Sequence, residues 1–276
     1  MIVIVILTNR DFFVITSLGS NWIIAPLLAK QRNNMNKQSR TKLISALALA
    51  STLVPTAMQA AEYSVTITNL TRGIYFTPLL VTAHDPSASL FTTGEVASAN
   101  LQAMAEGGDI SGLVSDLESL SATIVANPAE GLLGPGASVE TTLDTETNTA
   151  NSVLSIVAMM LPTNDGFVGL NSYALPTSVG EEVTINLSAY DAGTEANDEL
   201  VGSGAPGEAG FPAPGPVGEA SGMNGTGVAA DVEGFVHVHR NVLGDLSSTD
   251  GVSDIDATVH RWLNPVARVT VVLVSE

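Results

Sequence analysis

The chain has 276 residues, no cysteine and a formal net charge of −18, so disulfide, thiolate and zinc–cysteine chemistry are excluded. Residues 61–276 are more acidic still: they hold four arginines, no lysine and 27 acidic residues (28 less Asp11), for a formal charge of −23. Such a surface repels phosphate backbones and anionic headgroups. We therefore expect no nucleic-acid partner and no direct membrane binding.

Residues 35–60 have the pattern of a secretory signal peptide. A basic start precedes the apolar stretch Leu43–Pro55, and small residues lead up to a cleavage point after Ala60. Because a signal does not normally begin so deep in a chain, we interpret residues 1–34 as a mis-assigned upstream extension. A membrane anchor is the alternative, but no unbroken apolar run there reaches the roughly 20 residues of a spanning helix. We expect residues 61–276 to be exported as a secreted or periplasmic domain.

Strand patterns recur along the exported part. Apolar residues alternate with serine and threonine from Tyr63 to Thr68, which is the period of a half-buried strand, whereas Val153–Leu161 is a long apolar run. So many strands in about 216 residues predict a mainly β protein, an antiparallel β-sandwich. The predicted strands are residues 63–68, 73–83, 139–143, 153–161, 183–190 and 266–274.

Two short helices interrupt the strand pattern. In the first, apolar residues from Ala97 to Ala105 share one face, with Thr93 as N-cap and Gly107–Gly108 as the stop. In the second, which Asp109 opens, an apolar stripe runs from Ile110 to Leu120. The helices form an insertion within the sandwich.

Residues 191–230 form a long segment rich in glycine, proline, alanine and glutamate. Phe211 and Met223 are its large apolar side chains. Long loops inside a compact domain are usually functional or disordered, and so few apolar residues favour a mobile loop over a packed one.

Carboxylates follow two of the predicted strands. Asp191 and Glu195 stand four residues apart in the turn after residues 183–190, and Asp165 lies in a similar turn after Val153–Leu161. Two strand ends would bring these three carboxylates to one rim, where oxygen ligands suit a hard cation such as calcium. A solvated turn is the alternative, because Asp, Gly and Thr are ordinary turn residues.

Six separated blocks carry a family resemblance: Phe76–Leu80 with Ala83–His84, Gly94–Ser98, Leu101–Asp109, Pro162–Leu170, Tyr190–Glu195 and Asn264–Val271. In this order they resemble the N-terminal domain of the spondins, the family of F-spondin and mindin, and most of all its bacterial members. The family fold is an antiparallel β-sandwich like that of calcium-dependent phospholipid-binding domains.

The resemblance also implies a function. It suggests a secreted, non-enzymatic domain that binds calcium through Asp165, Asp191 and Glu195 and acts in adhesion or extracellular recognition. An unidentified extracellular protein or glycan would be its partner. The family usually has Asp where this chain has Glu195, so the reach of that ligand differs here.

Two histidines suggest a competing site. His237 and His239 lie two apart in a short strand-like run, so both imidazoles point to one face and could hold a transition metal. The alternative function is therefore a metal-dependent enzyme that uses this pair. Residues 245–256 contain four aspartates but lack the register of a calcium-binding loop, so we expect a solvated acidic turn there.

Overall fold

The computed structural model describes residues 2–7, 12–18, 21–26 and 61–276. The predicted signal peptide at residues 35–60 lies outside them, and the interpretation of residues 1–34 as an upstream extension stays a prediction. The chain divides into two compact units, Met1–Ala57 and Met58–Glu276. The first contains a three-stranded antiparallel sheet of β1 (Ile2–Leu7), β2 (Phe12–Leu18) and β3 (Asn21–Pro26). Among the described residues, no helix combines the length and apolarity needed to span a bilayer.

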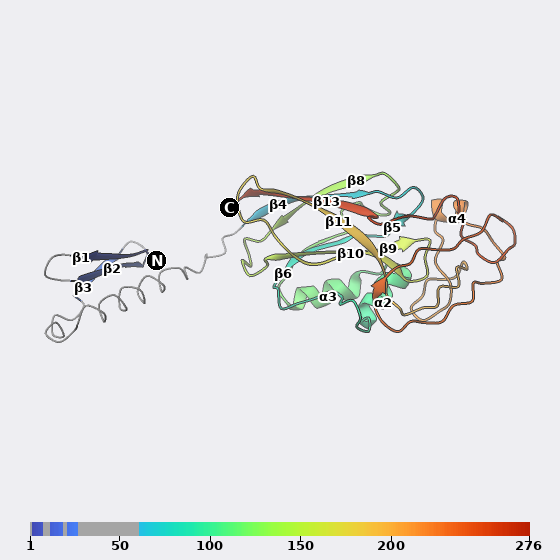
Figure 1. Cartoon of the computed structure of the whole chain (residues 1–276), viewed down its shortest axis with the longest axis horizontal. Coiled ribbons are helices and arrows are strands. Elements are labelled where there is room, and N and C mark those ends of the chain that lie inside the picture. Colours follow the sequence, from blue (N-terminus) through green and yellow to red (C-terminus); the bar gives the residue numbers. More distant parts are fainter. Residues whose placement is uncertain (1, 8–11, 19–20, 27–60) are drawn as a thin grey trace, which may run out of the picture. The chain divides into compact units, whose positions relative to one another are not determined.

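The second unit is built on one antiparallel sheet that folds into two layers (Figure 1). Its main path runs β7-β6-β9-β10-β11-β13-β4-β8, with β12 on β11 and β5 on β9. The hydroxyl of Thr123 on edge strand β7 donates to the Asp144 carbonyl on edge strand β8 at 3.2 Å, so the sheet nearly closes. The predicted mainly β, sandwich-like fold is confirmed. The strands are β4 (Glu62–Asn69), β5 (Tyr75–Phe76), β6 (Leu80–His84), β7 (Thr123–Ala126), β8 (Ser138–Asp144), β9 (Val153–Leu161), β10 (Gly166–Ala174), β11 (Glu182–Asp191), β12 (His237–Val238) and β13 (Ala267–Ser275).

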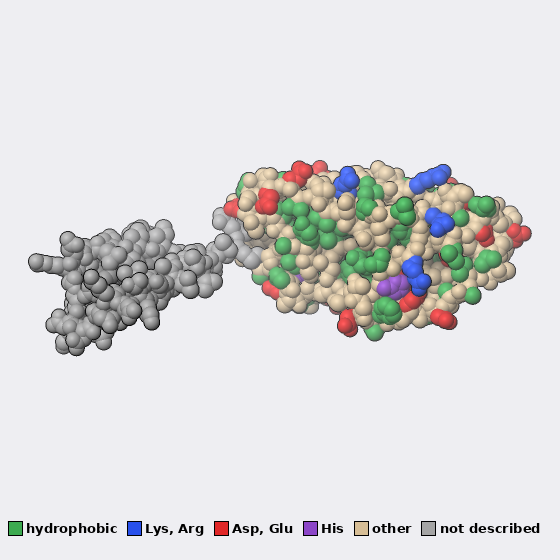
Figure 2. All heavy atoms as spheres, in the orientation of Figure 1, with side chains coloured by type: hydrophobic (Ala, Val, Ile, Leu, Met, Phe, Trp, Pro, Cys, Tyr) green, Lys and Arg blue, Asp and Glu red, His purple; other side chains and the backbone are tan. Residues whose placement is uncertain are grey.

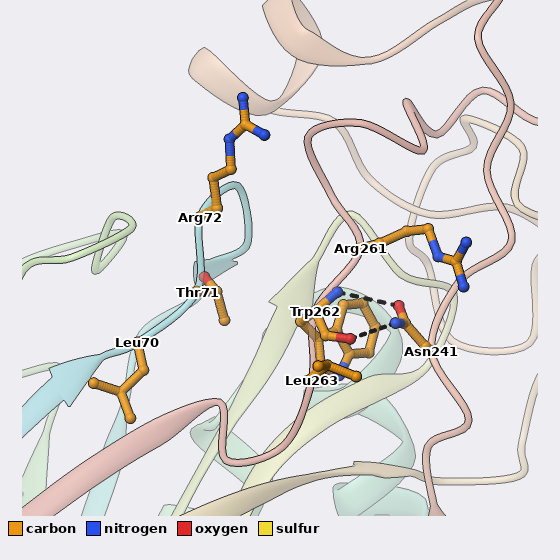
Figure 3. A pocket seen from close by; sticks show the side chains of 7 residues that line it. All are labelled: Leu70, Thr71, Arg72, Asn241, Arg261, Trp262 and Leu263. Carbon is orange, nitrogen blue, oxygen red and sulfur yellow. Dashed lines mark hydrogen bonds between the residues drawn. The ribbon is translucent and has the colours of Figure 1, made fainter.

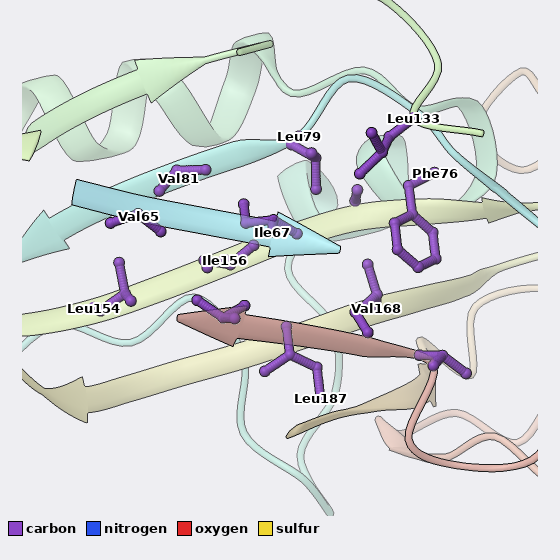
Figure 4. Close-up of a cluster of buried hydrophobic side chains, with 14 of the residues drawn as sticks. Val65, Ile67, Phe76, Leu79, Val81, Leu133, Leu154, Ile156, Val168 and Leu187 are labelled. Carbon is purple, nitrogen blue, oxygen red and sulfur yellow. The ribbon is translucent and has the colours of Figure 1, made fainter. Parts of the chain in front are cut away.

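Strand β11 belongs to both layers. Its residues 182–187 pair with β13 in one layer, and its residues 188–191 pair with β10 in the other. The main core fills the space between the layers, where the inward faces of β4, β6, β9 and β11 meet (Figure 4). This core includes Val65, Ile67, Phe76, Leu79, Val81, Leu154, Ile156, Val168 and Leu187.

Helices α2 (Ala99–Gly107) and α3 (Ser111–Ser119) cover the other face of β9 and β10. Every residue of β9 is therefore buried, which explains why its sequence, apart from Ser155, is apolar rather than alternating. The Ser98 hydroxyl caps α2 by accepting from the Leu101 N–H at 3.1 Å, so the predicted Thr93 cap is wrong. The predicted stop is confirmed, because Gly108 closes the helix in the left-handed region at φ 72°.

The long segment after Asp191 is packed, against our expectation of a mobile loop. Phe211 is fully buried in the main core, and Val217 on the short helix α4 (Pro216–Ala220) is buried under the helix layer. A backbone bridge between Val201 and Phe211 closes part of the segment. A few well-placed apolar side chains thus anchor a segment whose composition is typical of a loop.

The acidic turn at residues 245–256 is also less solvated than expected. Asp254 is only 5% exposed, and its carboxylate accepts N–H groups from Val201 and Gly225, each at 2.9 Å. Asp245 likewise accepts the N–H groups of Ser247 and Val252, each at 2.8 Å. These acids hold loop backbone in place through hydrogen bonds to backbone N–H groups.

Candidate metal centre

Strand pairing brings the first two predicted carboxylates together. In the antiparallel pair of β10 and β11, Gly166 lies opposite Asp191, so the start of one strand meets the end of the other. Asp165 directly precedes β10, and its carbonyl accepts the Ala192 N–H at 3.1 Å. Both aspartates are buried, with Asp165 0% and Asp191 1% exposed. The sequence predicted that strand ends would bring these carboxylates to one rim, and this is correct for Asp165 and Asp191.

The two oxygens of Asp165 have different surroundings. Oδ2 accepts the backbone N–H groups of Thr194 and Glu195 at 2.7 and 3.1 Å. Oδ1 is buried and has no hydrogen-bond partner. Burial, and next the negative charge of Asp191, raise the pKa of Asp165 to about 8. A buried carboxylate with one bare oxygen beside another carboxylate is costly unless a cation or a proton compensates it.

The two carboxylate oxygens of Glu195 also differ in their surroundings. Its Oε1 accepts from the Asn164 amide at 2.7 Å and from the Gly210 N–H, whereas its Oε2 is buried without a partner. Burial raises the pKa of Glu195, although these hydrogen bonds work in the opposite direction. Asn164 also donates to Asp198 at 2.8 Å, so one amide holds two acids of the loop after β11.

Asp191 faces the two histidines as well as Asp165. Strand β12 pairs with the end of β11 so that His237 lies opposite Asp191. The His237 Nε2 is 3.6 Å from Asp191 Oδ1, and the His239 Nε2 is 3.8 Å from Asp191 Oδ2. The two histidines do share one face, as their spacing predicts. The carboxylate site and the histidine site, which the sequence presents as competitors, meet at one residue.

A mixed set of ligands is the most compact one. Within residues 61–276, Asp191, Glu233 and His237 each offer an atom within 4.8 Å of the others. Asp165 and Glu195 lie outside that set, although the negative charges of Asp191 and Glu195 both raise the pKa of Asp165. The sequence reasoning missed Glu233 and the clamp Asn164. Glu233 stands four residues before His237, which is the one sequence signal that could have drawn attention to it.

Gly193 allows the turn after β11 to lie close to the segment before β12. Its φ is +67°, and a Cβ there would lie 2.3 Å from the Phe235 carbonyl oxygen. The Gly234 N–H donates to the Gly193 carbonyl at 2.8 Å, which fixes the segment that carries Glu233 and His237. The glycine is thus required both by conformation and by close backbone contact.

We expect Gly193→Ala to destabilise the protein more than Gly180→Ala. Both glycines have positive φ, at +67° and +82°, but a Cβ on Gly180 would meet nothing within 4 Å. The control should cost about 1–2 kcal/mol for its left-handed conformation. Gly193→Ala should add about 1–3 kcal/mol for the clash. Urea unfolding measures both, and equal losses would contradict the role of the close contact.

A pocket of about 590 Å³ is lined by Asn241 and Trp262, among other residues (Figure 3). Asn241 and Trp262 exchange hydrogen bonds at its floor, and the Trp262 ring packs edge-on against His239 with centroids 5.2 Å apart. Arg72 and Arg261 line the pocket, as do exposed side chains such as Leu263, which is 87% exposed. On the face shown in Figure 2, acidic side chains are spread over the surface and do not form a single patch.

Comparison with known proteins agrees with this architecture. Residues 61–201 match the Spondin_N family, a span that covers β4 to β11 and all three predicted carboxylates. Spondin-2 of Rattus norvegicus is 27% identical over 160 residues, which are 52% of this chain and 48% of that protein. The chain thus spans about half the length of that relative. Since the family match covers more than half of its residues, the chain belongs to the Spondin_N family.

Proposed function

We propose that residues 61–276 form a secreted, non-enzymatic calcium-binding domain that acts in adhesion or extracellular recognition. The observation that carries the proposal is the pair of buried, unpartnered oxygens, Asp165 Oδ1 and Glu195 Oε2, on the loops that flank Asp191. Membership of the spondin family and the similarity to Spondin-2 support an extracellular role. Export would use the predicted signal peptide at residues 35–60.

The chemistry of the donors suits calcium, although the ligand atoms of Asp165, Asp191 and Glu195 do not all lie within 4.8 Å of one another in this structure. Calcium takes six to eight oxygen ligands from carboxylates, carbonyls and water, and Asp165, Asp191 and Glu195 supply carboxylates from two adjoining loops. Bound calcium would neutralise charges that now repel each other in a buried place. It would also tie the loop before β10 to the loop after β11, which keeps the surface formed by these loops in one shape.

The surface formed by the loop before β10 and the loop after β11 would serve in recognition. The pocket beside the metal centre offers two of the four arginines of residues 61–276, Arg72 and Arg261, next to the exposed apolar Leu263. On a surface with a formal charge of −23, an acidic group of an extracellular protein or glycan would find its cationic contacts here. Trp262 and Asn241 connect the pocket to the metal centre through His239.

We expect calcium to raise the melting temperature of the purified exported domain. An ion that binds only the folded state stabilises it by about 2.7 kcal/mol at 100 times its Kd. Extracellular calcium modules have Kd values of about 0.1–1 mM, so about 10 mM calcium is about 10–100 times Kd and should raise the melting temperature by roughly 3–11 °C. Differential scanning calorimetry with and without a chelator measures the shift.

Magnesium is the matched control for this experiment, because it binds crowded surface acids but prefers a smaller octahedral shell. A magnesium shift well below the calcium shift supports a calcium-specific site. Identical melting curves in chelator, magnesium and calcium would contradict the proposed calcium function.

A further inference from the structure

Three potential ligand atoms surround a small space on the histidine side of Asp191. His237 Nε2 is 3.6 Å from Asp191 Oδ1 and 3.9 Å from Glu233 Oε1. Ligands around a tetrahedral zinc ion, each about 2.0–2.1 Å from the metal, are about 3.3 Å apart. The observed separations are thus close to the edges of a zinc coordination tetrahedron. They are too long for hydrogen bonds, which rarely exceed 3.2 Å.

Several buried atoms around this space lack a hydrogen-bond partner, although Asp191 Oδ1 accepts the Gly193 N–H at 2.8 Å. His237 Nε2, His239 Nε2 and Glu233 Oε2 are all buried at the atomic level and make no hydrogen bond. A protonated His237 bridging the two carboxylates would make short, charge-assisted hydrogen bonds near 2.8 Å. At 3.6 and 3.9 Å those bonds are not made. A cation between the three groups accounts for the spacing better than an ion pair does.

Hydrogen bonds at the far nitrogens separate the roles of the two histidines. His237 Nδ1 lies 3.0 Å from the Val238 carbonyl, so it must carry the proton and leaves a lone pair on Nε2. A backbone carbonyl that holds the second nitrogen is the usual support of a metal-binding histidine. His239 Nδ1 instead accepts the Asn241 N–H at 3.0 Å, so its Nε2 carries the proton. His239 therefore offers Asp191 a hydrogen and cannot offer a metal a lone pair.

His239 is suited to hold Asp191 in place. It is 6% exposed, its ring rests on Trp262, and its Nε2 is directed at Asp191 Oδ2 from 3.8 Å. The Asn197 amide donates to the same oxygen at 2.9 Å, and the Gly193 N–H donates to Oδ1 at 2.8 Å. The hydrogen bonds from Asn197 and Gly193 orient the Asp191 carboxylate, as outer hydrogen bonds orient the ligands of metal sites. His239 adds a packed neighbour 3.8 Å away.

We propose that Asp191, Glu233 and His237 bind a divalent transition-metal ion such as zinc, with His239 as a positioning residue for Asp191. Imidazole nitrogen suits zinc and is not a ligand of calcium, whose sites are built from oxygen. This position is distinct from the oxygen-only one at Asp165 and Glu195, and Asp191 lies between the two. Three protein ligands leave one place of a four-coordinate zinc ion for water.

The test uses the folded exported domain and zinc alone, titrated by calorimetry in excess magnesium so that surface acids are occupied. We expect one zinc ion per chain. His237→Gln should weaken zinc binding more than about 100-fold and Glu233→Gln at least about tenfold, since even outer hydrogen-bond partners contribute 10–100-fold. His237 has 18% of its side chain exposed, so this variant should fold. Cobalt offers a second readout, because four-coordinate cobalt absorbs visible light strongly and free cobalt does not.

Two further variants separate this site from the calcium position. Asp165→Asn should keep zinc binding while it loses calcium binding, and His237→Gln should do the reverse. Glu208→Gln, an exposed glutamate outside the site, should leave both unchanged. Zinc binding that survives His237→Gln, or that disappears with Asp165→Asn alone, would overturn the proposal. So would a parent domain that binds no zinc, even if it binds calcium normally.

Discussion

Asp165→Asn should weaken calcium binding by more than about tenfold, because the loss of a carboxylate ligand costs at least as much as the loss of an outer hydrogen bond. Asp191→Asn should do the same. Glu195→Asp restores the residue common in spondins and should change binding only modestly. Calorimetric titration of the three variants with calcium measures these effects. If both asparagine variants bind calcium like the parent, the three-carboxylate site is wrong.

Without calcium, Asp165→Asn should have the opposite effect and stabilise the fold. The pKa of Asp165 is about 8 in the folded protein, against an ordinary value of 3.8. Because the folded state binds this proton more tightly than the unfolded chain, the stability it contributes is complete below about pH 4. That stability is lost as the pH rises through 8. Between these limits the parent should lose about 1.4 kcal/mol per pH unit relative to the variant.

The comparison of parent and variant isolates Asp165 from other titrating groups. His239, whose pKa burial lowers, is present in both proteins and cancels in the difference. An asparagine amide in place of Asp165 Oδ1 would also put a donor where that oxygen now has no partner. Urea unfolding in chelator at pH 5, 6, 7 and 8 measures the difference. A difference that does not change with pH would show that Asp165 is not strained by its charge.

The fold class and the meeting of Asp165 with Asp191 could be predicted because both follow from strand patterns. An apolar run and an alternating run each end next to an acidic turn. Strand β10 lies between them, and its start pairs with the end of β11, which brings Asp165 to Asp191. Strand β10 was missed because Gly169, Asn171 and Ser172 interrupt its apolar pattern. Its burial comes from Phe91 and α2, which the local sequence does not specify.

The proposed metal ligand Glu233 could not be predicted from sequence for the same physical reason. Glu233 lies far along the chain from Asp191, in a segment with no periodic pattern. Its approach depends on the backbone contact between Gly193 and Gly234, a long-range contact without a local signature. The opposite tautomers of His237 and His239 likewise depend on Val238 and Asn241 backbone groups, so spacing alone made the pair look equivalent.

Phe167→Ala should cause the largest loss of stability, about 3–5 kcal/mol, because it removes a fully buried aromatic ring and leaves a cavity. Phe167 is 0% exposed and contacts two other rings, Phe91 at 5.1 Å edge-on and Tyr190 at 5.6 Å stacked, measured between centroids. This aromatic group lies between the helix layer and the end of β11, two residues along from Asp165. Guanidinium or urea unfolding measures the loss.

Two companion variants make this result specific to packing. Phe167→Leu keeps most of the buried volume and should cost less than about 1.5 kcal/mol. Leu263→Ala removes an apolar side chain that is 87% exposed, so its effect should stay within about 0.5 kcal/mol. Since Phe167 packs beneath the strand end that carries Asp191, Phe167→Ala should also weaken calcium binding, whereas Leu263→Ala should not. Equal stability losses for Phe167→Ala and Leu263→Ala would contradict the placement of Phe167 in the core.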